Sequence, residues 1–145
     1  MSFFIDTSSL VKIYHKEENS HKVIELYNSN ETIYISELAK IEFVSTAYRK
    51  YRENEIIHEA LHVLMDKFQS DVESRYKLLK FSSLVCDGAL DLLHNIGKKY
   101  GLRTLDSIQL AFFLTYCEED DIFVCSDKQL ASIVQNQGYN IFSFV

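Results

Sequence analysis

The chain has 145 residues, 47% hydrophobic and 25% charged, and its 15 Lys and Arg against 21 Asp and Glu give a formal net charge of -6. That length suits one domain with its own hydrophobic core, and we expect residues 1–145 to form it. The acidic balance argues against binding nucleic acid by bulk positive charge. The absence of Pro and the presence of only 4 Gly argue against a loop-rich or all-β protein.

The sequence also bears on where the protein works. No apolar run approaches the roughly 20 residues of a membrane span, and no basic segment precedes the apolar residues 3–5, so we expect neither a membrane protein nor a secretory signal. Cys86, Cys117 and Cys125 are odd in number and lack C-x-x-C spacing. We interpret them as reduced thiols of a cytoplasmic protein.

Short apolar runs alternate with longer helical patterns along the chain. Runs rich in β-branched and aromatic residues predict strands, whereas apolar residues three or four positions apart predict helices. The expected elements, in chain order, are a strand at 3–5, helices at 10–14 and 22–27, a strand at 32–35, helices with apolar stripes at 38–48 and 56–68, a strand at 78–81, helices at 84–99 and 104–116, a strand at 122–125, a helix at 130–134 and a strand at 141–142.

Several residues mark the ends of these helices. Ser36 is a typical N-cap, residues 126–129 (SDKQ) fit a capping box, and Gly101 is a natural C-cap. Apolar strands that alternate with helices imply an α/β fold, in which helices cover a mostly parallel sheet. In such a sheet, functional sites form at the carboxyl ends of the strands.

Four carboxylates stand at positions that this fold brings toward one edge. Asp6 and Asp127 follow predicted strands, Asp106 lies in the first turn of a helix, and Glu42 interrupts the apolar residues 41–44. Carboxylates that converge repel each other, and a divalent cation such as Mg²⁺ or Mn²⁺ relieves that repulsion because hard ions prefer oxygen ligands. The alternative for Asp106 and Asp127 is an ordinary role beside a helix N-terminus.

Four segments resemble those of one protein family. Residues 6–12 (DTSSLVK) resemble the opening of PIN-domain ribonucleases, and more narrowly of VapC-type toxins. Residues 36–42 (SELAKIE), 102–111 (LRTLDSIQLA) and 123–131 (FVCSDKQLA) resemble the segments that carry the family's second, third and fourth acids, in the same order and spacing. Cys125 departs from the Thr that the family often has there, and residues 67–76 match nothing in the pattern.

The resemblance implies a PIN-like three-layer fold with four or five short strands. It also implies a Mg²⁺- or Mn²⁺-dependent endoribonuclease, with Asp6, Glu42, Asp106 and Asp127 as catalytic and metal-binding residues. We expect Asp6 and Asp106 to ligate the principal ion, Glu42 to position or deprotonate the attacking water, and Asp127 to complete the metal's shell. As a toxin of a toxin-antitoxin pair, such a protein would cleave RNA, bind a cognate antitoxin and form a homodimer.

Other residues were assigned supporting or peripheral roles. Thr7, Ser8, Thr104 and Ser126 are expected to support the site, although Thr7 and Ser8 could equally serve only to cap a helix. The candidates for holding RNA at the rim are Lys12, Lys40, Arg49 and Arg103. The candidates for an antitoxin or dimer interface are Tyr48, Tyr51 and Tyr76, with core packing as the alternative.

Two alternative functions remain open at this point. Residues 58–62 (HEALH) are a literal H-E-x-x-H, in which His58 and His62 would share a helix face as zinc ligands with Glu59 as general base. No third His follows at the spacing of the larger zinc proteases, so this metalloprotease function is the less favoured one. The other is a PIN-like binding module without useful nuclease activity, against which the presence of all four acids argues.

Overall fold

The computed structural model describes residues 1–142 and 144. Its strands are β1 (Ser2–Ile5), β2 (Thr32–Ser36), β3 (Lys77–Leu79), β4 (Ile122–Val124) and β5 (Asn140–Ile141). Its helices are α1 (Thr7–Tyr14), α2 (Ser20–Asn28), α3 (Glu37–Arg52), α4 (His58–Ser74), α5 (Ser83–Leu92), α6 (Lys98–Tyr100), α7 (Thr104–Tyr116) and α8 (Lys128–Asn136), with a π-helical turn at Leu93–Gly97 between α5 and α6. None of the helices in the described residues is long and apolar enough to cross a membrane.

The described strands form one sheet in the order β3-β2-β1-β4-β5, and every neighbouring pair is parallel. Strand β1 lies at the centre, with Phe3 opposite Ile33 of β2 and Phe4 opposite Phe123 of β4. The predicted α/β fold with a parallel sheet of four or five short strands is confirmed. Because all strands run the same way, the residues that follow β1 and β4 meet at one edge.

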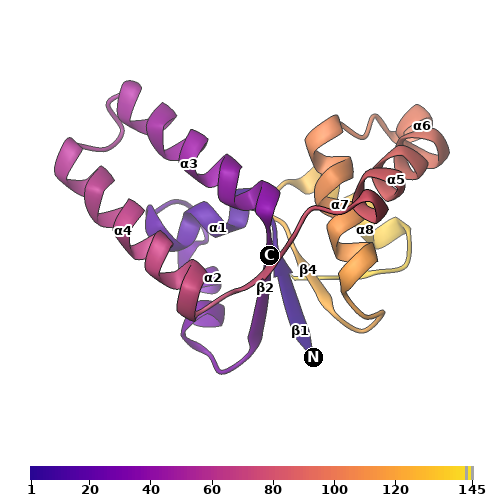
Figure 1. Cartoon of the computed structure of the whole chain (residues 1–145), viewed down its shortest axis with the longest axis horizontal. Coiled ribbons are helices and arrows are strands. Elements are labelled where there is room, and N and C mark those ends of the chain that lie inside the picture. Colours follow the sequence, from indigo (N-terminus) through magenta and orange to yellow (C-terminus); the bar gives the residue numbers. More distant parts are fainter. Residues whose placement is uncertain (143, 145) are drawn as a thin grey trace.

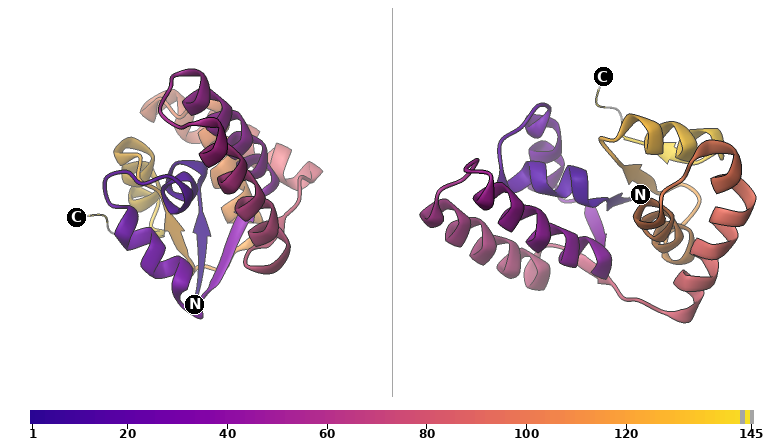
Figure 2. Two further views of the ribbon diagram at one scale, coloured as in Figure 1. Left: turned by 90° about the vertical axis from the view of Figure 1, so that its left-hand side faces the viewer. Right: turned by 90° about the horizontal axis from the view of Figure 1, so that it is seen from above.

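Successive side chains of β1 point to opposite faces of the sheet, and each face packs against a different group of helices. Phe3 and Ile5 belong to a core cluster with residues of α1 to α4, whereas Phe4 belongs to a cluster with residues of α5, α7 and α8. The ribbon views show these two groups of helices on opposite sides of the central strands, with α3 and α4 forming an arm beside the sheet (Figures 1 and 2). The result is the expected three-layer arrangement.

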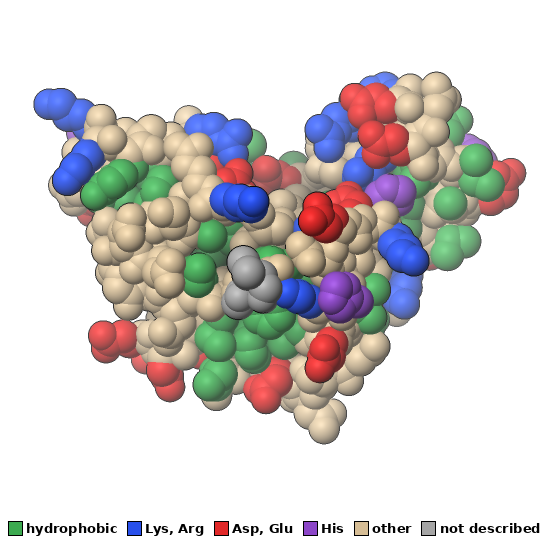
Figure 3. Space-filling view, turned by 180° about the vertical axis from the view of Figure 1, so that it is seen from behind, with side chains coloured by type: hydrophobic (Ala, Val, Ile, Leu, Met, Phe, Trp, Pro, Cys, Tyr) green, Lys and Arg blue, Asp and Glu red, His purple; other side chains and the backbone are tan. Residues whose placement is uncertain are grey.

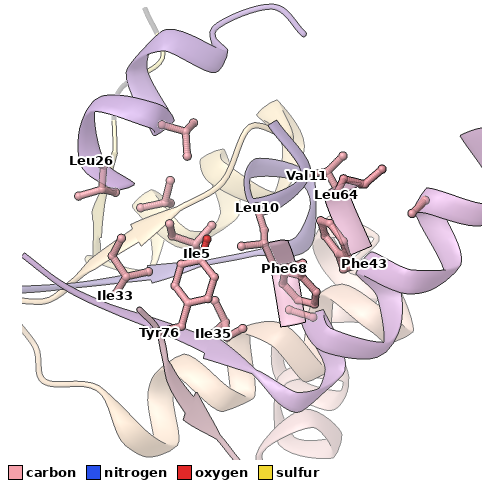
Figure 4. Close-up of a cluster of buried hydrophobic side chains, with 14 of the residues drawn as sticks. Ile5, Leu10, Val11, Leu26, Ile33, Ile35, Phe43, Leu64, Phe68 and Tyr76 are labelled. Carbon is pink, nitrogen blue, oxygen red and sulfur yellow. The ribbon is translucent and has the colours of Figure 1, made fainter. Parts of the chain in front are cut away.

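An aromatic stack joins the arm to the sheet. The rings of Phe43 on α3 and Phe68 on α4 stack with their centroids 3.8 Å apart, and both side chains are buried. Figure 4 shows them beside Ile5, Leu10 and Ile35. This packing fixes how α3 leaves the sheet, and α3 is the helix that carries Glu42.

The segment at 67–76, which matched nothing in the family pattern, contributes to this core. Asp71 is buried, and its carboxylate accepts hydrogen bonds from the hydroxyls of Tyr14 (2.6 Å) and Tyr27 (2.9 Å). Tyr76 is also buried, with its hydroxyl 2.6 Å from that of Tyr14. The core alternative for Tyr76 is therefore the right one, whereas Tyr48 and Tyr51 are exposed.

The predicted elements differ from the structure in a few places. The apolar stripe on α3 is divided, because Leu38 and Ala47 are buried but Ile41, Val44 and Tyr48 are exposed. The helix predicted at 84–99 is interrupted by the π-helical turn, which the apolar periodicity does not reveal. Gly101 ends it as expected, with a φ of 66° that favours glycine.

The predicted Ser and Thr caps were wrong at two helices, whereas the capping role that the sequence also allowed for Asp127 is the one observed. Asp6, rather than Thr7 or Ser8, caps α1, and Asp127, rather than Ser126, caps α8 with its Oδ1 accepting from the Leu130 amide at 3.0 Å. An aspartate is at least as good an N-cap as serine or threonine, and its negative charge suits a helix N-terminus. Ser36 caps α3 as predicted.

Candidate active site

The four acids predicted from the sequence line a single cavity of about 450 Å³ at the carboxyl edge of the sheet. Asp6 follows β1, Asp127 follows β4 by three residues, Glu42 lies in the second turn of α3, and Asp106 lies in the first turn of α7. In the space-filling view, the surface is hollowed between two lobes, and acidic and basic side chains gather there (Figure 3). The fold therefore brings together four carboxylates that are as many as 121 positions apart in the chain.

Asp6 is the most deeply placed of the four. It is 6% exposed, accepts a hydrogen bond from the Ser9 amide at 3.1 Å, and accepts the Ser8 hydroxyl at 2.9 Å. Burial nevertheless raises the pKa of the Asp6 carboxyl to about 6, because these hydrogen bonds offset only part of the cost of desolvating its charge. A cation at this carboxylate would recover that cost.

Glu42 is held by a chain of hydrogen bonds that begins in the core. Ser36 donates to the amide oxygen of Gln109 at 2.8 Å, and the amide nitrogen of Gln109 donates to Glu42 at 3.2 Å and to Thr7 at 3.0 Å. Thr7 in turn donates to Glu42 at 2.8 Å. The same Oε1 atom of Glu42 receives both bonds, which fixes one oxygen and leaves the other for a ligand.

Gln109 was given no role from the sequence, although it lines the cavity and is 3% exposed. One signal could have identified it. It is the polar residue between Ile108 and Leu110, three positions after Asp106, and so lies near the same face of α7. A buried amide at that position needs polar partners, and those partners turn out to be site residues.

Asp106 and Asp127 are held differently, by the guanidinium of Arg103. Its Nε lies 3.1 Å from Asp106 and its Nη2 lies 3.2 Å from Asp127. The side chain of Arg103 is 70% exposed, and those of Asp106 and Asp127 are 23% and 36% exposed. Arg103 thus supplies a positive charge between two carboxylates, at a place where a divalent cation would also be attracted.

The other predicted supporting residues are only partly brought together. Thr7, Ser8 and Ser126 line the cavity, and Ser126 donates to the Ser8 hydroxyl at 2.9 Å. Thr104 is exposed and does not line the cavity. It begins α7, and its backbone carbonyl accepts a hydrogen bond from the Ser107 hydroxyl. Cys125 is buried beside Asp6, and burial raises the pKa of its thiol, so this residue stays neutral.

Basic side chains line the cavity on more than one side. Lys12, Arg49 and Arg103 line it as predicted, and Lys50, which the sequence had not indicated, lines it too. Lys40 does not line it. Lys12 and Lys50 both pair with Glu17, at 3.5 and 3.0 Å.

The candidate ligands are carboxylates and hydroxyls, which all offer oxygen atoms. This set suits a hard divalent cation, because such ions prefer oxygen ligands. Asp6 and Asp106 could hold such an ion, with Glu42 and Asp127 beside them. Among residues 1–142 and 144, no three His, Cys, Asp or Glu side chains are already close enough to ligate one ion. The exposed Arg103 and its two carboxylates are the part of the site that can move to close it.

Comparisons with known proteins agree with this fold. The family model of the PIN domain matches residues 3–134. Three solved structures resemble the chain over nearly its whole length: DNA-bound VapBC from Salmonella typhimurium (TM-score 0.69, 15% identity, 100% of this chain and 99% of that one), VapBC2 from Rickettsia felis bound to a promoter DNA fragment (0.68, 17%, 98% and 98%) and a toxin-antitoxin complex from Klebsiella pneumoniae (0.62, 16%, 100% and 98%). A search among curated proteins gives no match.

Proposed function

Because this chain belongs to the PIN-domain family, we propose that it is a metal-dependent endoribonuclease and the toxin of a toxin-antitoxin pair. The observation that carries this proposal is the convergence of Asp6, Glu42, Asp106 and Asp127 on one cavity. A metal-dependent nuclease needs negative charge to hold a divalent cation and an open cleft to admit a phosphodiester, and this cavity offers both.

The proposed roles follow from how each carboxylate is held. When bound, Mg²⁺ or Mn²⁺ would supply Lewis-acid stabilisation of the charge that develops on the phosphate. Asp6 and Asp106 would hold the ion, and Asp127 would complete its surroundings. Glu42 has one oxygen fixed by Thr7 and Gln109, so its other oxygen is positioned to accept a proton from an attacking water.

The basic rim offers contacts for the negatively charged backbone of RNA. Lys12, Arg49 and Lys50 lie on the α1 and α3 side of the cavity, and Arg103 lies on the α7 side. Arg103 is well suited to a phosphate, because a guanidinium can donate two parallel hydrogen bonds to it. Once a cation binds Asp106 and Asp127, Arg103 would be released from them and could turn toward the substrate.

We also propose an antitoxin partner, because three of the similar structures are toxin-antitoxin or VapBC complexes. The exposed apolar side chains Ile41, Val44 and Tyr48 lie on α3, next to the cavity residue Glu42. A partner that covered them would also restrict access to the acids. A homodimer and a cytoplasmic location remain expectations from the family resemblance.

The test is cleavage of a mixed RNA substrate by the purified chain with Mg²⁺ or Mn²⁺, with and without EDTA. We expect cleavage that EDTA abolishes and that Asp6→Asn reduces to background, while His94→Ala, an exposed substitution away from the cavity, cleaves like the wild type. Cleavage by Asp6→Asn at the wild-type rate would contradict the proposal. A wild-type chain that never cleaves but binds an antitoxin tightly would favour the binding module.

A further inference from the structure

Two histidines on α4 bring their outer ring nitrogens together. His58 is the first residue of α4 and His62 lies one turn later, and both side chains are exposed. Their Nε2 atoms are 3.2 Å apart, with ring centroids at 4.5 Å and ring planes at 79°. Neither residue lines the carboxylate cavity, so the proposed nuclease site does not account for this pair.

The spacing matches what one transition-metal ion requires. Zn²⁺ binds imidazole nitrogen at 2.0–2.1 Å, so two nitrogens at a tetrahedral angle lie about 3.4 Å apart. The observed separation of 3.2 Å is close to this value, so a rotation of the rings about their side-chain bonds can direct both nitrogens at one ion without moving the helix. We propose that His58 and His62 form a two-ligand surface site for a borderline divalent ion of the Zn²⁺, Ni²⁺ or Cu²⁺ class, which imidazole prefers over Mg²⁺.

The helix holds this pair in place. Leu61, Leu64 and Phe68 of α4 are buried against the core, which fixes the rotation of the helix about its own axis. The ring of Tyr51 on α3 packs against His58 with centroids 6.1 Å apart. Both imidazoles are thus presented on a rigid element, which lowers the entropy lost when an ion binds.

The site differs from that of a zinc protease. A catalytic zinc in such enzymes has three protein ligands, and residues 1–142 and 144 offer no group of three His, Cys, Asp and Glu that could share an ion. Water would complete the coordination at His58 and His62. The predicted general base Glu59 lines a different hollow, together with Ile13 and Tyr14.

The test is calorimetric titration of the full chain, without an affinity tag, with ZnCl₂ or NiCl₂ in excess MgCl₂. We expect one ion to bind per chain at this site. His58→Ala and His62→Ala should each weaken binding at least about tenfold, because removing even an outer partner of a metal ligand costs that much. His94→Ala is the matched control and should bind like the wild type. All three exposed substitutions should leave RNA cleavage unchanged.

A repeat in the Asp6→Asn background separates this site from the carboxylates. Binding that persists there and still depends on His62 supports the inference. Two results would overturn it. One is that Asp6→Asn abolishes the binding, and the other is that both His58→Ala and His62→Ala bind the ion as tightly as the wild type. Circular dichroism of each variant establishes that a loss of binding does not come from unfolding.

Discussion

The two halves of the carboxylate cavity are built in different ways. Asp6 is buried and accepts bonds from Ser8 and Ser9, and Glu42 is held by Thr7 and Gln109. Asp106 and Asp127, in contrast, are 23% and 36% exposed and pair with the exposed Arg103. We call Asp6 and Glu42 the rigid half, because other groups of the protein hold both carboxylates. We call Asp106 and Asp127 the adaptable half, because a ligand can replace the exposed Arg103 that pairs with them, even though Asp127 also caps α8.

That difference has an energetic consequence. A fixed and buried carboxylate offers precise geometry but destabilises the protein, because its charge is desolvated without full compensation. Exposed ion pairs cost little to form and little to break, since water screens both partners. The rigid half therefore sets the position of the ion, and the adaptable half lets ion and substrate enter.

Removing a ligand in the adaptable half should also cause a large loss of activity, as we expect of Asp6→Asn in the rigid half. Asp106→Asn should reduce RNA cleavage roughly 1,000-fold, about 4 kcal/mol in the activation barrier, because it removes a charged metal ligand. The thermal midpoint should stay near that of the wild type, since Asp106 is partly exposed. Single-turnover cleavage and a melting curve check both, with the exposed Asp91→Asn as control. Normal cleavage by Asp106→Asn would mean that the rigid half suffices.

The second effect is on stability and comes from the rigid half. Burial raises the pKa of Asp6 from 3.8 to about 6, so between those values the unfolded chain loses a proton that the folded chain keeps. Stability without metal should therefore fall as pH rises through this window, by up to about 3 kcal/mol. Asp6→Asn should remove that loss while keeping the N-cap.

Urea unfolding in EDTA at pH 3.5 and pH 7.5 measures this effect. The Asp6→Asn variant should be more stable than the wild type at pH 7.5, and the difference should largely disappear at pH 3.5, where Asp6 is mostly protonated in both the folded and the unfolded chain. Asp127→Asn, at a more exposed cap, should show a much smaller gain. An Asp6→Asn variant that is less stable than the wild type at pH 7.5 would show that the buried charge of Asp6 does not destabilise the folded protein.

The third effect concerns the hydrogen-bond chain to Glu42. Gln109→Ala removes the acceptor of the buried Ser36 hydroxyl and one of the two donors to Glu42, so we expect a loss of about 1–3 kcal/mol in stability. We also expect about a tenfold fall in kcat with little change in KM, because Glu42 would lose its fixed orientation. The exposed Gln135→Ala is the control. An unchanged kcat in a folded Gln109→Ala variant would assign Gln109 a purely structural role.

The smallest effect should come from Arg103. Arg103→Ala removes the charge that competes with a cation for Asp106 and Asp127, so Mn²⁺ should bind several-fold more tightly. Arg103→Lys keeps the charge and should show a smaller change. Titration of Mn²⁺ into each variant measures this. Weaker Mn²⁺ binding by Arg103→Ala would mean that Arg103 organises the acids rather than masking them.

The sequence revealed more about the acids than about what holds them. Asp6 and Asp127 were predictable because parallel strands end at the same edge of a sheet. Asp106 in a first helical turn and Glu42 in an apolar run were candidates from position alone, and the family resemblance strengthened the prediction of all four. The position of Gln109 in an apolar run could have marked it as a candidate, but its partners could not be predicted, since they depend on how α7 faces α1 and α3 in space. The ion pairs of Arg103 also depend on packing, because Asp127 is 24 positions away.

The wrong predictions of helix caps and of the apolar face of α3 can be explained by nearby residues. The one-residue shifts of both helix caps arose because serine, threonine and aspartate all satisfy the same capping pattern. The exposed Ile41 and Val44 broke the expected stripe because α3 packs through Phe43 instead. Apolar periodicity predicts the buried face of a helix only when a single neighbouring element covers that face.

The most direct test of the central claim is Mn²⁺ binding by the wild type and by Asp6→Asn, both carrying His58→Ala and His62→Ala so that only the carboxylate cavity is measured. If the rigid half sets the position of the ion, the protein with intact carboxylates binds Mn²⁺ and Asp6→Asn loses that binding. Mn²⁺ binding that is equal in the two proteins would contradict the claim that this cavity is a metal site.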